Sequence, residues 1–424
     1  MSKKKVLTCF LLLAIAFTFM ACPGRDRTGR NDGRTRIRVV HWDLTTMVYI
    51  TALVDAFKEA HPEIAVEIID IPSADYTQRL QIMLNGGSDF DVFWIKDGDT
   101  TKGLADRGHL ADLSAFIEDD NIRLQDFHGV AERFIMNDKI VALPASTGFW
   151  VLYYNKDIFD RAGIPYPSND LTWPEWEELA GRLTSGTGQN KIFGGLLHTW
   201  QACVQNWAVQ DGRNTIIAND YYFFRPYYEM ALRMQRAGYI WDYGVLRAGG
   251  IHYTSLFLQG NIATMPMGTW FFTTIIDRID RGETNIRWGM ATLPRPPDVE
   301  PGWTVGSVTP IAINNASRNK EASWEFVRFI TSDEGAKIYA SFGQFPGRAT
   351  PETMEMVAAL PGMPEGSAEA LIVRNIALDR PMELRVAEIN QMLGEEHALI
   401  MLEEVTIERG LENMARRSRE IQSR

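Results

Sequence analysis

Cysteine is scarce in this chain, which has three cysteines among 424 residues: Cys9, Cys22 and Cys203. Cys9 lies within an N-terminal apolar stretch of the secretory-signal type, and Cys22 stands at its end. If that stretch is removed and Cys22 is modified, the mature chain has no internal disulfide. A chain of this length buries enough core to fold without one, so we expect Cys203 to be a buried, inert thiol.

The chain also lacks an excess of basic residues, since it has 43 Lys and Arg but 54 Asp and Glu. Nucleic-acid binding requires a basic face, so the acidic balance argues against it. The sequence has no Gly-x-Ser-x-Gly, His-Glu-x-x-His or Walker A motif, and its seven histidines lack metal-ligand spacing. The segment Asp97-Gly98-Asp99 begins like a calcium loop, but Lys102 stands where that loop requires glycine. We therefore expect no catalytic residues, no metal and no cofactor.

The N-terminus carries an export signal over residues 1–21, because three lysines precede an apolar run that is too short to span a bilayer comfortably. The junction Phe19-Met20-Ala21-Cys22 resembles a bacterial lipobox, in which the cysteine thiol receives a diacylglyceryl group. Phe19 departs from that pattern, since Leu, Val or Ile is usual there, and ordinary cleavage near Ala21 is the alternative. Residues 22–35, rich in Arg and Gly, then form a flexible tether. These features predict an exported protein that contacts the membrane through lipid at Cys22 alone.

The region after the tether alternates short apolar strands with helical patterns. Strands are predicted at 37–42, 64–69 and 91–95, with helices at 51–60 and 76–84 between them. This alternation is typical of a parallel sheet with helices on both faces, and ligands in such sheets bind beyond the carboxyl ends of the strands.

The character of the sequence changes near residue 142. A strand is predicted at 151–154 and another at 289–294. Thr172 and Glu175 have the spacing of a capping box and open a helix. The stretch from Met382 to the end is predicted as one long helical region.

Five motifs follow one another in a recognisable order. They are GGSDFDVFWIKDGDTTKGLADRGHLADLS (86–114), ALPASTGFWVLYYNKDIFDRAGIPYP (142–167) with LTWPEWEELAGRLT (171–184), LFLQGNIATMPMGTW (256–270), AINNASRNKEASWEFVRFITSDEGAKIYASFGQFPGR (312–348) and VTIERGLENMARRSREI (405–421). Together they resemble the bacterial extracellular solute-binding proteins of family 1, the sugar receptors of ABC importers. The resemblance covers residues 36 to 424.

The resemblance implies an α/β, two-lobed periplasmic-binding-protein fold (type II-like) with a hinge between the lobes. Each lobe would be a mainly parallel sheet flanked by helices. Residues 36–145 plus 306–345 would form the first lobe, and residues 146–305 plus 346–424 the second. The implied receptor is a monomer without enzymatic activity that binds a carbohydrate in the cleft, closes by hinge bending, and delivers it to the membrane subunits of an ABC permease.

Aromatic rings suit the C–H faces of a sugar, whereas carboxylates, amides and Arg suit its hydroxyls. Strand ends and the family's usual positions together give the predicted ligand contacts Trp42, Asp43, Asp97, Trp200, Trp270, Trp303 and Arg348, with Gln81 and Trp150 as weaker candidates. For each Trp the competing interpretation is core packing, which we prefer for Trp173, Trp176 and Trp324. For each Asp it is capping of the next helix.

Three other functions stay open at this point. The same fold could bind a polyamine, an iron complex, a phosphate or a glycerol-phosphate-type solute. A surface lipoprotein with an adhesive or structural role would need no aromatic cleft. Paired acids at Asp89 and Asp91, and at 118–120, could indicate a glycoside-acting enzyme, although a strand start and a solvated loop explain them more simply.

Overall fold

The computed structural model describes residues 33–424 with the exceptions of 46, 74 and 97. The predicted signal peptide 1–21, Cys22, most of the tether 22–35 and the ligand candidate Asp97 therefore lie outside the described residues. Residues Thr35–Arg424 form one compact unit. No helix in the described part of the chain has the length and apolar character needed to cross a membrane.

The first five predicted elements are confirmed. They are β1 (Thr35–Trp42), α1 (Val48–Ala60), β2 (Ile64–Ile71), α2 (Tyr76–Asn85) and β3 (Val92–Trp94). β1 lies between β2 and β3 and is parallel to both. The buried residues of α1 show why it forms: Ile50, Leu53, Val54 and Phe57 follow the 3.6-residue period and face the sheet.

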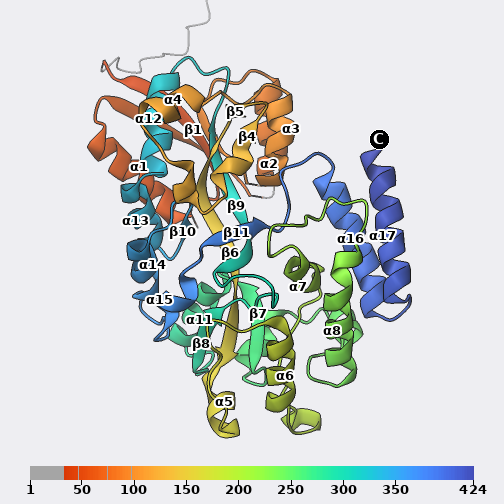
Figure 1. Cartoon of the computed structure of the whole chain (residues 1–424). Helices are drawn as coiled ribbons and strands as arrows, with labels where there is room; N and C mark the ends of the chain where they lie inside the picture. The colour runs from red at the N-terminus through yellow and green to blue at the C-terminus, as the bar shows by residue number, and fades with distance from the viewer. Residues whose placement is uncertain (1–32, 46, 74, 97) are drawn as a thin grey trace, which may run out of the picture. The chain divides into compact units, whose positions relative to one another are not determined.

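Two long antiparallel strands, β6 (Leu143–Asn155) and β9 (Trp303–Ile313), connect the two lobes (Figure 1). At one end, β9 pairs with β3 of the first lobe, and β10 (Phe345–Pro346) pairs with β6. At the other end, β6 pairs with β7 (Thr264–Gly268) and β8 (Trp288–Thr292), while β9 pairs with β11 (Asn375–Leu378). Strand order is β10-β6-β9-β3-β1-β2 along the main path.

The second lobe departs from the expected mainly parallel sheet, because β7 and β8 are both antiparallel to β6. β6 enters this lobe from the first one and is flanked there by strands that run the opposite way. A short buried apolar strand has the same residue pattern in parallel and antiparallel sheets, so the sequence carried no signal for this direction.

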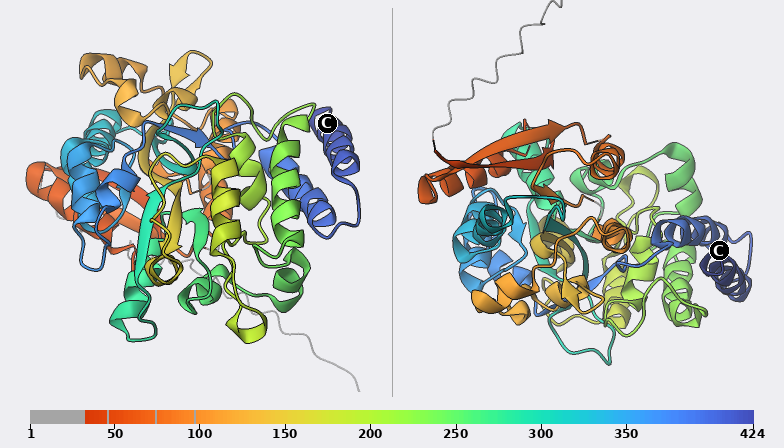
Figure 2. Two further views of the ribbon diagram at one scale, coloured as in Figure 1. Left: turned by 60° about the horizontal axis from the view of Figure 1, so that its bottom comes forward. Right: turned by 90° about the horizontal axis from the view of Figure 1, so that it is seen from above.

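The C-terminal region is also different from its prediction as one long helical segment. It forms two helices, α16 (Val386–Met401) and α17 (Ile407–Gln422). The chain turns between them where Glu403 adopts a left-handed conformation (φ 57°) and Thr406 caps α17 by accepting from the Arg409 amide. Both helices lie beside α8 (Arg225–Arg236) in the second lobe (Figures 1 and 2).

The remaining elements are short. They are β4 (Ile135–Met136), β5 (Lys139–Ile140), α3 (Thr101–Asp106), α4 (Ser114–Asp119), α5 (Lys156–Ala162), α6 (Trp173–Leu183), α7 (Ala202–Gln205), α9 (Tyr243–Gly249), α10 (Tyr253–Leu258), α11 (Phe271–Asp280), α12 (Lys320–Ile330), α13 (Asp333–Ser341), α14 (Pro351–Ala358) and α15 (Ser367–Leu371). The predicted capping box of Thr172 and Glu175 is present at the start of α6.

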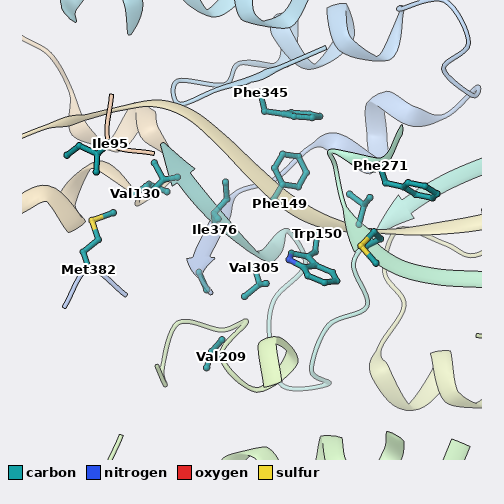
Figure 3. Packing of buried hydrophobic residues seen from close by; sticks show 14 of the residues in the cluster. Ile95, Val130, Phe149, Trp150, Val209, Phe271, Val305, Phe345, Ile376 and Met382 are labelled. Carbon is teal, nitrogen blue, oxygen red and sulfur yellow. The ribbon is translucent and has the colours of Figure 1, made fainter. Parts of the chain in front are cut away.

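The crossing of the long strands is tightly packed. Figure 3 shows Phe149 and Trp150 of β6 beside Val305 of β9, with Phe345 over the Phe149 ring, and the two phenyl centroids are 4.9 Å apart. Gly306 lies opposite Phe149, and a Cβ at this position would overlap the carbonyl oxygen of Gly148. A residue without a side chain is therefore required at this position of β9.

Candidate functional site

Three tryptophans form an aromatic wall on the second lobe. Trp150, Trp200 and Trp270 line a cavity of about 200 Å³. Trp150 is buried, but Trp200 is 38% exposed and Trp270 is 44% exposed. Large aromatic rings that stay this exposed beside a cavity offer faces on which a ligand can stack.

The segment Met267–Trp270 explains how the Trp270 ring is placed. The ring folds back over Gly268, the last residue of β7, so that a Cβ on this glycine would overlap the indole. The Trp270 Nε1–H donates to the Tyr253 hydroxyl at 3.3 Å. One edge of the ring is thus fixed to the protein, while the side chain keeps a substantial exposed area.

A continuous chain of indole rings connects this wall to the core of the second lobe. Trp173 contacts Trp176 edge-on at 5.6 Å and stacks on Trp207 at 4.2 Å between centroids. Trp207 contacts Trp150 at 5.4 Å, and Trp150 contacts Trp270 at 5.7 Å, both nearly perpendicular. The core prediction for Trp173 and Trp176 is confirmed, since both are almost fully buried.

A smaller cavity of about 70 Å³ lies on the side of the first lobe. It is lined by Lys96, Gly98, Ser307, Val308, Thr309, Leu378, Asp379, Arg380 and Met382. Asp379 and Arg380 also line the aromatic cavity, so the two cavities are neighbouring parts of one cleft. Residues after β3 and along β9 thus line the part of the cleft that adjoins the tryptophan wall.

The first-lobe side of the cleft is held by a short hydrogen-bond network. The Lys96 Nζ donates to the backbone oxygen of Ser73 at 2.8 Å and to its hydroxyl at 2.6 Å. The Ser73 amide in turn donates to the Asp43 carboxylate at 2.8 Å. Asp43 therefore fixes the loop after β2 and places Lys96 at the cleft.

Amide side chains complete the second-lobe wall, and sequence reasoning missed all of them. Gln201, Gln205, Asn206 and Asn390 line the aromatic cavity. The Gln201 Nε2 donates to the Asn390 side-chain oxygen at 2.9 Å, and the Gln205 Nε2 donates to the Tyr228 hydroxyl at 2.8 Å. No local sequence pattern marks these residues, because the contacts between them span as many as 189 positions.

A histidine beside this wall is neutral near neutral pH. His198 lies beside Trp200 at 4.8 Å and Tyr253 at 5.3 Å between centroids. Burial, helped by neighbouring His252, lowers the pKa of His198 to about 4, so its imidazole is neutral. Cys203 is fully buried, and burial raises the pKa of its thiol to about 12, which confirms the prediction of an inert thiol.

In the part of the chain that the structure describes, no group of three or more His, Cys, Asp or Glu side chains is arranged to hold a metal ion. The aromatic cavity offers stacking surfaces and amide hydrogen-bonding groups, and its lining includes one acid, Asp379, and one base, Arg380.

Comparison with known proteins assigns the family. The bacterial extracellular solute-binding protein family matches residues 41–337. The chain belongs to this family. As a solute-binding protein it is a receptor rather than an enzyme, which confirms the prediction of a non-enzymatic function.

Solved and characterised relatives cover most of this receptor. A sugar transporter of Rhizobium etli, solved in an open conformation, is 37% identical with a TM-score of 0.88, over 91% of this chain and 99% of that one. The arabinooligosaccharide-binding protein of Bacillus subtilis is 23% identical over 362 residues, which are 81% of each protein. A substrate-binding protein of Listeria monocytogenes, in complex with cycloalternan, has 23% identity and a TM-score of 0.72, over 92% and 99% of the two chains. The predicted α/β periplasmic-binding-protein fold is thereby confirmed.

Two of the tryptophans that were predicted to contact the ligand lie outside the lining of the two cavities. Trp42 is 7% exposed and stacks on His41 at 4.1 Å, so it packs in the first-lobe core. Trp303 is half-buried, and its carbonyl accepts from the Gln210 side chain at 3.1 Å. Neither tryptophan is among the residues that line the two cavities.

The polar residues that were predicted to contact the ligand also differ in where they lie. Arg348 forms ion pairs with Asp126 at 3.0 Å and Asp333 at 3.4 Å, and it is not among the residues that line the two cavities. Gln81 is an exposed residue of α2 and lines neither cavity. Of the predicted set, Trp150, Trp200 and Trp270 are brought together, and Asp43 supports Lys96 of the neighbouring cavity through Ser73.

Proposed function

We propose that the protein is the receptor of an ABC importer and captures a mono- or oligosaccharide in the cleft between its lobes. The observation that carries this proposal is the pair of half-exposed indoles, Trp200 and Trp270, on one cavity. The C–H face of a sugar ring stacks on such surfaces, while its hydroxyls find amide partners at the edge.

The charge of the aromatic cavity favours an uncharged ligand. The aromatic cavity is lined by one acid, Asp379, and one base, Arg380, and by neutral residues otherwise. A polyamine site would need several carboxylates around its aromatic rings, and a phosphate site would need more cations than the single Arg380 of this cavity, which Asp379 balances in charge. The names of relatives support the same conclusion, since one is a sugar transporter and another binds arabinooligosaccharides.

Closure of the lobes follows from contacts on both sides of the cleft. A sugar held by Trp270 on the second lobe and by the Lys96 side on the first gains its full set of contacts only when the lobes approach. A ligand shifts an equilibrium only by its differential affinity for the two states, so these shared contacts favour the closed form. The closed receptor, a monomer, then delivers the sugar to the permease.

A thermal-shift panel tests the ligand class. Arabinooligosaccharides, lactose, maltose, mannitol, spermidine and inorganic phosphate are each added to the purified protein, and the melting temperature is recorded. A sugar at about 100 times its Kd raises the stability of the folded state by about 2.7 kcal/mol, which is readily measured. Stabilisation by spermidine or phosphate with no response to any sugar would contradict the proposal.

Anchoring is the second part of the proposed function. We expect Cys22 to receive a diacylglyceryl group and to hold the receptor at the cell membrane through the tether 22–35. Cells fed radiolabelled palmitate should label the wild-type protein, whereas the Cys22→Ser variant should stay unlabelled and leave the membrane fraction. Equal labelling of both proteins would exclude Cys22 as the lipid site and would leave the sugar proposal intact.

A further inference from the structure

One amide in the aromatic cavity differs from its neighbours. Asn206 lies in a 3-10 turn (Asn206–Ala208) directly after α7 and lines the cavity. Its side chain is almost fully buried, with 3% of the residue exposed, yet the Nδ2 group has no acceptor among the described residues. Gln201 and Gln205 in the same wall both donate to protein oxygens.

An unpartnered amide of this kind is unusual inside a folded protein. Most buried polar side chains have a hydrogen-bond partner, because the loss of solvation is otherwise uncompensated. The backbone at Asn206 is in addition held by its neighbour, since Trp207, the next residue, stacks on Trp173 at 4.2 Å. The amide thus lies in the wall of the cavity, and a ligand oxygen that reaches Nδ2 can supply the missing acceptor.

The position of Asn206 relative to the indoles defines what it can recognise. Trp150, Trp200, Trp270 and Asn206 all line one cavity of about 200 Å³. A sugar stacked on an indole face directs its hydroxyl groups outward from the edge of its ring. An amide in the wall of the same cavity can donate to one such oxygen and so distinguish sugars by the presence of that hydroxyl.

We propose that Asn206 is a specificity-determining residue of this receptor and donates a hydrogen bond to one hydroxyl oxygen of the stacked sugar. The inference rests on the proposed function, since it requires a carbohydrate in the cleft. It predicts that the receptor rejects the derivative of its sugar that lacks this hydroxyl, by about 10- to 100-fold in Kd.

The test combines a variant with modified sugars. Calorimetry measures Kd for the panel sugar that gives the largest thermal shift, chosen from arabinotriose, lactose and maltose, and for each of its monodeoxy derivatives. Wild-type protein should bind one derivative about 10- to 100-fold more weakly than the parent sugar. The Asn206→Leu variant should bind the parent weakly and should bind that derivative with nearly the same Kd.

The stability of the ligand-free protein separates recognition from a structural role. Asn206 donates no hydrogen bond from Nδ2 within the described structure, so Asn206→Leu should leave the melting temperature unchanged or raise it. Asn261 offers a matched control, because its Oδ1 is also buried without a donor but the residue does not line the aromatic cavity. Asn261→Leu should keep the wild-type pattern of sugar affinities.

The possible results separate the role of Asn206 from the proposed sugar-binding function. If wild-type protein binds a panel sugar and Asn206→Leu keeps the same affinities for parent and deoxy sugars, the role of Asn206 is wrong and the proposed function stands. A variant that melts well below wild type without ligand would instead assign Asn206 a structural role. If no sugar binds wild-type protein, the proposed function and the inference both fail.

Discussion

The Trp270→Ala variant is expected to bind its sugar about 1–3 kcal/mol more weakly than wild-type protein, with an unchanged fold. Trp270 is 44% exposed at the cavity, so its removal takes away a stacking surface and little core packing. Isothermal titration calorimetry against the best panel sugar measures the effect, and the melting temperature of the ligand-free variant checks the fold.

Two companion variants show whether the position of the ring matters as well as its presence. Gly268→Ala places a Cβ where the Trp270 indole now lies, so the ring must move away from β7. We expect this variant to lose affinity although it retains the tryptophan. Tyr222→Ala is the control, because Tyr222 is 56% exposed but lines neither cleft cavity. Unchanged affinity in Trp270→Ala would remove this residue from the proposed site.

Local sequence patterns were sufficient to predict the first five elements of the first lobe, from β1 to β3. In α1 the residues Ile50, Leu53, Val54 and Phe57 repeat at helical spacing, and the structure buries all four. The antiparallel neighbours of β6 could not be predicted in the same way. The pairing of Trp150 with Gly268 joins residues far apart in the chain, and register between distant strands leaves no mark on either segment alone.

In the candidate site, too, short sequence motifs predicted some residues, whereas contacts between residues far apart in the sequence could not be predicted. Trp270 was predicted because the family resemblance places a ring-stacking residue at the end of the Gly-x-Trp motif, and the glycine of that motif makes room for the ring. Trp42 occupies the strand end that the prediction used, but its packing on His41 decides its burial. Arg348 is neutralised by Asp126, which is 222 positions away in sequence, so its ion pair could not be anticipated.

The Trp173→Ala variant is expected to lose about 3–5 kcal/mol of folding stability, measured by urea unfolding. Trp173 is 2% exposed and stacks on Trp207, so its removal leaves a large cavity in the second lobe. Its Nε1–H also donates to Gln210 at 3.1 Å, and the buried amide oxygen would lose this partner. Because Trp207 supports Trp150 at the cavity, sugar affinity should fall as well.

A tryptophan of the first lobe separates the two effects. Trp324 is 3% exposed, stacks on Phe116 at 5.3 Å and donates to Asp120, so Trp324→Ala should destabilise the protein by a similar amount. Trp324 does not belong to the chain of indole rings that runs from Trp176 to Trp270. The sugar affinity of Trp324→Ala, measured below the unfolding transition, should therefore match that of wild-type protein. Equal losses of sugar affinity in Trp173→Ala and Trp324→Ala would mean that general destabilisation, rather than the chain of indole rings, controls binding.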